Sequence, residues 1–195
     1  DMELSIIDEL PLNRIPITTK VINPDRLKRV YSFMAKQFNE GKQDMVIYPL
    51  VEESEKSDLA AAVQAHENFK NKIFKKFKVG LVHGRMDSNE KDLTMEKFSK
   101  NQINLLVSTT VIEVGIDFPD ANLIIIENAN KFGLAQLHQL RGRVGRGTDQ
   151  GICVLLYKEA LSKNSIKRLK ILKKTDDGFY IAEEDLKLRG FGDLI

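Results

Sequence analysis

The sequence contains no tryptophan and one cysteine, Cys153, in 195 residues. A single cysteine cannot form an internal disulfide, and its apolar neighbours predict a buried thiol that acts as a small hydrophobic side chain. The three histidines (His66, His83 and His138) and Cys153 show no metal-ligand spacing, so we expect no protein-bound structural metal. No charged-then-apolar leader opens the chain, and its longest apolar runs are too short to cross a bilayer. These absences predict a cytoplasmic protein.

Charge of one sign is not in excess either. The chain has 30 basic and 28 acidic residues, a net charge of +2. Bulk charge therefore does not identify a nucleic-acid binder, and any such claim depends on where the cations lie. The hydrophobic content of 42% and charged content of 30% are typical of a globular chain. Because the chain begins at Asp1, we expect it to be part of a longer protein.

Apolar runs rich in Val, Ile and Leu alternate with helical patterns along the chain. The runs predicted as strands are residues 17–22, 44–51, 78–83, 104–108, 122–127 and 151–157. Nearly continuous apolar runs suit strands that are covered on both faces, as in a parallel sheet. The alternating order predicts a three-layer α/β domain with a mainly parallel sheet and right-handed crossovers.

Helices are predicted between these strands. The first starts at Asn23-Pro24, a good N-cap and first-turn pair, and the others span about residues 59–75, 88–100 and 134–140. Asp87 and Glu90 predict a variant of the capping box at the third helix. The acidic stretch 52–58 is predicted to be a solvated loop.

The pattern changes after Tyr157. Residues 162–174 predict a basic amphipathic helix, and residues 179–188 predict a second helix that ends at Arg189-Gly190. We therefore expect two parts, with the α/β domain over residues 1–160 and an appended helical hairpin over residues 161–195.

The most informative motif is Gln-x-x-Gly-Arg-x-Gly-Arg, formed by Gln139, Gly142, Arg143, Gly145 and Arg146. Glycines around two arginines let the backbone bring both guanidinium groups close to a phosphate. Each guanidinium stays charged at any working pH and can bind two phosphate oxygens. An arginine aimed at a γ-phosphate stabilises the charge that develops in phosphoryl transfer. The alternative is a basic turn that caps helix carbonyls.

Two further segments follow predicted strands, where open α/β sheets bind ligands. In His83-Gly84-Arg85, a glycine between donors allows a phosphate to approach the backbone, although an ordinary tight turn explains the residues equally well. Thr109 and Thr110 are expected to point hydroxyl and amide groups outward, toward sugar-phosphate oxygens.

Two carboxylates follow the threonines. Glu113 and Asp117 lie four residues apart around Gly115. Carboxylates in this arrangement suit ribose hydroxyls or a hydrated cation, and a polar connection between strands is the alternative.

In order and content, these segments resemble the C-terminal conserved motifs of superfamily 2 helicases, and the RecG family in particular. The resemblance covers essentially the whole chain. It is carried by DMELSIIDELP (1–11), IYPLVEESEK (47–56), VGLVHGRM (79–86), STTVIEVGIDFPDA (108–121), IENANKFGLAQLHQLRGRVGRG (126–147) and DGFYIAEEDLKLRGFGDL (177–194). Transcription-repair coupling factors share FGLAQLHQLRGRVGR but lack the IDELP opening and the EES stretch.

The resemblance implies the second RecA-like lobe (P-loop NTPase fold) of an ATP-dependent DNA helicase. Such enzymes translocate on double-stranded DNA and remodel stalled forks and Holliday junctions in recombination and repair. It implies that Arg143 and Arg146 reach the ATP γ-phosphate, with Arg146 as the arginine finger. Further ATP contacts are implied for Gln139, Glu113, Gly115 and Asp117.

The same resemblance implies DNA contacts at Thr109, Thr110 and the turn of His83, Gly84 and Arg85. It also assigns a coupling role to Arg189 in the C-terminal hairpin. The family motif continues beyond the point where this chain stops, at Ile195, so the motif is incomplete here.

The chain contains no G-x-x-x-x-G-K-[ST] phosphate loop and no Asp-Glu box. ATP and Mg²⁺ are therefore expected to be held mainly by another lobe, and this chain alone is expected to be inactive. The expected partners are branched DNA and the N-terminal lobe and wedge domain of the full-length protein. Two alternatives remain: the same lobe of a transcription-repair coupling factor, or a non-catalytic binding module.

Overall fold

The computed structural model describes residues 2–5, 18–22, 24–50, 55–109, 121–144, 151–157, 162–174 and 187. The strands are β1 (Met2–Ser5), β2 (Thr18–Ile22), β3 (Asp44–Tyr48), β4 (Val79–Val82), β5 (Leu105–Thr109), β6 (Leu123–Ile126) and β7 (Ile152–Leu156). The α-helices are α1 (Leu27–Asn39), α2 (Glu55–Asn68), α3 (Ser88–Ser99), α4 (Leu134–Arg141) and α5 (Lys163–Lys174). Short helical turns are η1 (Pro24–Arg26), η3 (Phe69–Ile73, a π-helix) and η4 (Ala129–Lys131).

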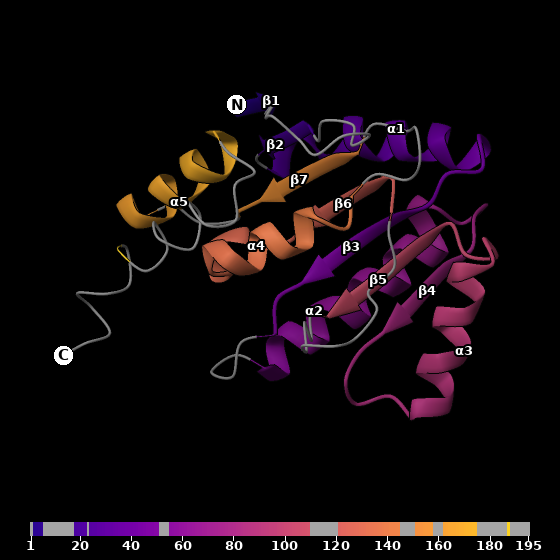
Figure 1. The fold of residues 1–195 in the computed structure, drawn as a ribbon. Helices are drawn as coiled ribbons and strands as arrows, with labels where there is room; N and C mark the ends of the chain where they lie inside the picture. The colour runs from indigo at the N-terminus through magenta and orange to yellow at the C-terminus, as the bar shows by residue number, and fades with distance from the viewer. Residues whose placement is uncertain are drawn as a thin grey trace.

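The seven strands form one sheet in the order β1-β2-β7-β6-β3-β5-β4 (Figure 1). Among the described strands, β1 pairs antiparallel with β2, and all other neighbouring strands are parallel. The predicted mainly parallel α/β sheet is therefore confirmed. Strand β1 was not predicted from the sequence, because its four residues are too few for an alternating pattern to be recognised.

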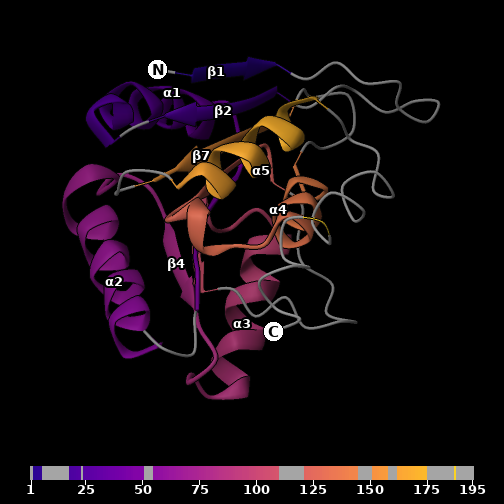
Figure 2. The ribbon, with the colours of Figure 1, turned by 90° about the vertical axis from the view of Figure 1, so that its left-hand side faces the viewer.

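Helices cover both faces of the sheet and produce the predicted three layers. One hydrophobic cluster joins α1, α2 and η3 to one face of the strands. A second cluster joins α3, α4 and α5 to the other face. Figure 2 shows α2 on one side of the strands and α4 on the other.

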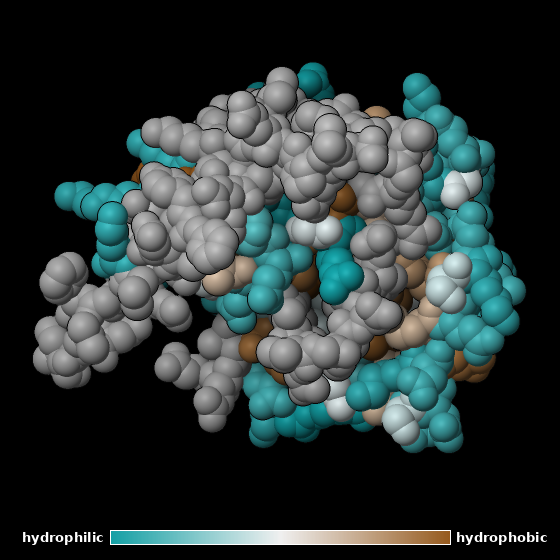
Figure 3. Space-filling model, viewed as in Figure 1, coloured by the Kyte–Doolittle hydropathy of each residue, from teal (hydrophilic) through white to brown (hydrophobic). Residues whose placement is uncertain are grey.

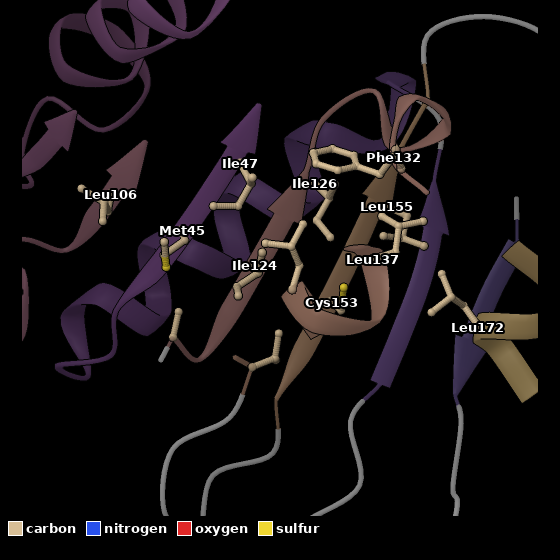
Figure 4. Close-up of a cluster of buried hydrophobic side chains, with 14 of the residues drawn as sticks. Met45, Ile47, Leu106, Ile124, Ile126, Phe132, Leu137, Cys153, Leu155 and Leu172 are labelled. Atoms are coloured by element: carbon tan, nitrogen blue, oxygen red, sulfur yellow. The ribbon is translucent and has the colours of Figure 1, made fainter. Parts of the chain in front are cut away.

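The central strands are buried along their whole length, as their apolar runs predicted. Met45, Ile124 and Cys153 point toward the α4 side of the sheet, where Leu137 packs over them (Figure 4). Cys153 is 1% exposed, which confirms the predicted buried thiol. Burial raises the pKa of this thiol to about 12, and the nearby charge of Arg141 only partly opposes the effect.

Helix α2 begins earlier than the sequence analysis predicted. Residues 55–58, predicted as part of a solvated loop, form its first turn. Acidic side chains such as Glu55 and Asp58 are favourable there because the helix dipole is positive at its N-terminus. Asp58 is also buried and accepts from Lys131 Nζ at 3.3 Å, so it is not a loop residue exposed to water.

Two other predictions concern helix ends. Asp87 is the N-cap residue of α3, but its side chain makes no capping hydrogen bond, so the predicted capping box is not formed. Helix α5 confirms the predicted helix over residues 162–174 almost to the residue. The second helix of the predicted hairpin, and Asn23, lie outside the described residues. Within the described ranges, no helix is long and apolar enough to span a membrane.

Candidate functional site

The carboxyl ends of β3, β4 and β5 lie at one edge of the sheet and carry part of the predicted site. The strands are parallel neighbours, with Tyr48 paired to Thr109 and Val82 paired to Ser108. The turn that starts at His83 follows β4 directly, next to the end of β5. The structure therefore brings the His83 turn and Thr109 to the same edge, as the sequence analysis expected.

The His83 turn is held by its own hydrogen bonds. Arg85 donates its backbone N–H to His83 Nδ1 at 3.2 Å, and Met86 donates to the His83 carbonyl at 3.2 Å. Partial burial, followed by the positive charge of Lys91, lowers the pKa of His83. Because Nδ1 accepts a hydrogen bond, the imidazole is neutral here and carries its proton on Nε2. Nε2–H is then available as a hydrogen-bond donor.

Arg85 and Gly84 are exposed in this turn. The Arg85 guanidinium contacts Glu55, at the first turn of α2, with Nη2 and Oε1 3.4 Å apart. Both side chains are largely in water, and exposed ion pairs of this kind contribute only about 0–1 kcal/mol. A phosphate group can therefore replace Glu55 as the partner of Arg85 at little cost.

Thr109 does not follow β5 but is its last residue, and it is only 3% exposed. The outward-pointing hydroxyl that the sequence predicted for Thr109 is therefore wrong. The physical reason is that β5 pairs one residue further with β3, and a central strand is covered on both faces. The hydroxyl is buried without a hydrogen bond to the described residues. The predicted site residues Thr110, Glu113, Gly115 and Asp117 lie outside the described ranges.

Helix α4 carries the glutamine and leads into the arginine motif. Gln139 is exposed, and Gly142 ends the helix with its N–H bonded to the His138 carbonyl at 3.0 Å. A Cβ atom at Gly142 would come within 3.3 Å of the Gln139 carbonyl oxygen. Glycine at this position thus lets the backbone pass close to the Gln139 carbonyl as the chain leaves the helix.

The backbone of Arg143 is fixed at the opposite ends of the strands from His83. Its N–H donates to the Leu140 carbonyl at 3.0 Å, and its carbonyl accepts from Ala121 at 2.9 Å. Ala121 lies two residues before β6 and also pairs with Val144. Arg143 therefore does not lie at the carboxyl edge of the sheet with the His83 turn and Thr109. Because α4 runs back antiparallel to the strands, it delivers Arg143 to their amino ends.

The side chain of Arg143 is partly exposed, whereas that of Arg141, two residues earlier, is 2% exposed. Arg141 donates through Nη1 to the carbonyl of Leu172 in α5, and its Nη2 lies 3.5 Å from His138 Nδ1. Leu172 is in the last turn of α5, where carbonyl groups lack helical partners and the helix dipole favours a cation. Arg141 therefore fastens α4 to α5.

Arg141 is not among the site residues predicted from the sequence, although the sequence contains a signal for it. Leu134, Leu137 and Arg141 lie at helical spacing, and all three are buried. The position of Arg141 on this stripe predicts an inward side chain, which distinguishes it from Arg143. Arg146 and Arg189 are outside the described residues.

Among the residues that the structure describes, no three His, Cys, Asp or Glu side chains are grouped so that they could hold a metal ion. The described part of the site consists instead of cationic side chains and N–H donors. Such groups bind anions, and phosphate oxygens fit them best.

Comparison with known proteins identifies a family and several similar proteins. Residues 25–148 match the family described as the helicase conserved C-terminal domain. The chain is 48% identical to the ATP-dependent DNA helicase RecG of Synechocystis sp. over 195 residues, covering 100% of this chain and 23% of that protein. It is 50% identical to RecG of Aquifex aeolicus over 198 residues, covering 100% of this chain and 25% of that protein. The chain thus spans about a quarter of the length of these relatives.

Solved structures give the same fold. A structure of RecG bound to a three-way DNA junction matches with a TM-score of 0.76 and 42% identity, covering 96% of this chain and 24% of that one. The second domain of the DEAD-box helicase Mss116p, solved with an RNA duplex, matches with a TM-score of 0.57 and 19% identity over 87% of this chain and 68% of that one. At that identity the likeness concerns the fold alone.

Proposed function

The chain belongs to the helicase conserved C-terminal domain family, and on this premise we propose that it is the second motor lobe of a RecG-type ATP-dependent DNA helicase. The full-length protein would translocate on double-stranded DNA and remodel branched DNA in recombination and repair, in the cytoplasm. Residues 1–160 would form the RecA-like lobe, and residues 161–195 would form the module that couples hydrolysis to movement, including Arg189.

The observation that carries this proposal is the contrast between Arg141 and Arg143. Arg141 turns inward and is used for packing, whereas Arg143 is held by its backbone with its guanidinium partly in water. A fixed backbone with an accessible cation suits a group that must meet a phosphate from another lobe. We assign Arg143 and Arg146 to the γ-phosphate of ATP, with Arg146 as the finger.

The two ends of the strands support separate binding sides for nucleotide and DNA. Arg143 lies at the amino end of β6, while the His83 turn and Thr109 lie at the carboxyl ends of β4 and β5. We propose that nucleotide is bound on the first side, with Gln139, Glu113, Gly115 and Asp117. DNA would be bound on the second side by His83, Gly84, Arg85 and Thr110. The rigid sheet between the two sides can then transmit motion from one to the other.

ATP supplies the energy of the reaction, and the described cations fit its phosphates. Arg143 is a charged residue that is partly exposed, so its guanidinium is accessible to a phosphate from another lobe. Mg²⁺ has no comparable set of carboxylates among the described residues. We therefore assign the metal and most of the nucleotide contacts to the N-terminal lobe. This chain would bind phosphate and orient it, and alone it would not hydrolyse ATP.

The test is to substitute Arg146→Ala in the full-length protein and to measure DNA-stimulated ATP hydrolysis. An arginine finger contributes about 10³- to 10⁵-fold in rate, so we expect hydrolysis to fall by at least three orders of magnitude while DNA affinity is retained. Arg29→Ala, an exposed arginine on α1, is the matched control and should keep the wild-type rate. Comparable hydrolysis by Arg146→Ala and the wild type would refute the assignment.

A further inference from the structure

Three turns at the amino ends of β3, β4 and β5 carry an excess of lysine. These turns are residues 40–43, 74–78 and 100–104, and their strands are neighbours in the sheet. They contain one acidic residue, Glu40, and five lysines. We call these five residues the lysine platform: Lys42, Lys75, Lys76, Lys78 and Lys100.

Hydrogen bonds fix the three turns to one another. Asp44 N–H donates to the Asn104 carbonyl and Asn104 N–H donates to the Lys78 carbonyl, each at 2.9 Å. Lys78 N–H in turn donates to Asn104 Oδ1 at 2.9 Å, and Asn101 Nδ2 donates to the Gly41 carbonyl at 3.1 Å. The lysine platform is therefore one rigid surface, although its residues are far apart in the sequence.

Aromatic packing also determines where the lysines point. Phe74 lies between Phe38 and Phe69, with ring centroids 5.3 Å and 5.6 Å away, and Phe77 packs on Phe38 at 5.2 Å. Phe74 is 1% exposed, whereas Lys75 and Lys76 directly after it are exposed. The phenylalanines thus anchor the turn, and the ammonium groups between them are held in water. Little backbone entropy is lost when such a surface binds a ligand.

Carboxylates neutralise the cations of the platform only in part, and the charge of Lys42 acts on the buried Asp44. Within the described ranges, Lys75, Lys76 and Lys78 form no ion pair, and Lys100 pairs only with Glu96, at 2.7 Å on the surface. Figure 3 shows mainly hydrophilic side chains on the side of the molecule where β3, β4 and β5 begin. Neighbouring like charges repel each other, and a polyanion would relieve this repulsion.

We propose that the lysine platform forms a second contact with the phosphate backbone of duplex DNA, separate from the contact at the His83 turn. The platform lies at the amino ends of β3, β5 and β4, beside the nucleotide side proposed at β6. Adjacent strands lie about 4.8 Å apart, so the three turns span roughly 10 Å, over which a duplex carries about six negative charges. Lysine is a point charge without the fork geometry that reads bases, so the contact is independent of sequence. The proposal rests on the proposed function, in which the full-length protein acts on DNA.

The test compares two double variants of the full-length protein. Lys75→Gln/Lys76→Gln removes two adjacent platform charges, and Lys28→Gln/Arg29→Gln removes two adjacent exposed charges from the far end of α1. Binding to a fluorescent blunt duplex is measured by anisotropy as a function of salt. Each lost phosphate contact makes the slope of log K against log salt less steep by about 0.9 and weakens binding about eightfold at 0.1 M salt. We expect a loss of one to two contacts for the platform variant and none for the α1 variant.

Three results would overturn the proposal. The first is a wild-type salt slope for the platform variant, and the second is an equal loss of DNA affinity in both variants. The third is a platform variant that keeps the DNA slope but loses binding to phosphatidylserine vesicles, which would identify a membrane as the partner. DNA-stimulated hydrolysis is measured in parallel at saturating DNA and low salt, and the platform variant should keep it. If the wild-type protein showed no DNA-stimulated hydrolysis, the proposed function would be contradicted. The salt slopes would still show whether the lysine platform binds DNA.

Discussion

Arg141→Met tests whether Arg141, which occupies an unspecified position of the arginine motif, is a structural residue. The guanidinium of Arg141 is 2% exposed and donates to the Leu172 carbonyl in the last turn of α5. Methionine keeps the apolar stem but has no donor. The substitution would leave a buried carbonyl at a helix C-terminus without its partner, and α5 would lose its polar connection to α4.

The expected magnitude follows from these contacts. A hydrogen bond from a charged donor contributes about 1.5–3 kcal/mol to stability. The substitution also removes the cost of burying a charged guanidinium, and this gain offsets part of the loss. We therefore expect the free energy of unfolding to fall by about 2 kcal/mol. For a chain of this length, such a change lowers the melting temperature by roughly 4–8 °C.

Thermal unfolding followed by circular dichroism measures the effect, with Arg143→Met as the matched control. Arg143 is partly exposed, and surface substitutions usually change stability by less than about 0.5 kcal/mol. Equal melting temperatures for Arg141→Met and Arg143→Met would refute the distinction drawn between the two arginines. A destabilised Arg143→Met beside an unaffected Arg141→Met would reverse it.

Two further predictions concern the core. Gly80→Ala should lower the melting temperature by the equivalent of about 1–3 kcal/mol, because its Cβ would lie 2.9 Å from Ile103 Cδ1 and 3.2 Å from Thr94 Cγ2. The control Gly133→Ala, with its nearest atom at 3.8 Å, should change the melting temperature little. Cys153 should resist a thiol reagent at pH 8 until urea unfolds the chain; rapid labelling of the native protein would contradict its burial. The pKa of Cys153 is about 12 in the folded chain and 9.0 in the unfolded chain, so its contribution to stability should decrease as the pH rises from 9 toward 12. Urea unfolding at each pH measures this loss of stability, and Cys153→Ala should remove the part of the loss that is due to the thiol.

Periodicity and composition were sufficient for most of the fold. The continuous apolar runs at 44–48, 105–109 and 123–126 are buried on both faces, and only a covered parallel strand needs that composition. The helix at 163–174 could be predicted because a single amphipathic stripe determines both its existence and its buried face. The errors lie at element ends: α2 begins four residues earlier than predicted, at Glu55, and β5 ends one residue later, at Thr109. The exact end of an element depends on tertiary contacts, which the local sequence pattern does not contain.

The sequence by itself determined the chemistry of the site: the types, order and spacing of its cations, glycines and hydroxyls. Only the tertiary structure decided where each group points and which segments meet. It turned Arg141 inward and left Arg143 accessible, because α5 packs against α4 and needs a cation at its last turn. It also joined Lys42, Lys78 and Lys100 on one surface, because parallel pairing places the beginnings of distant strands side by side.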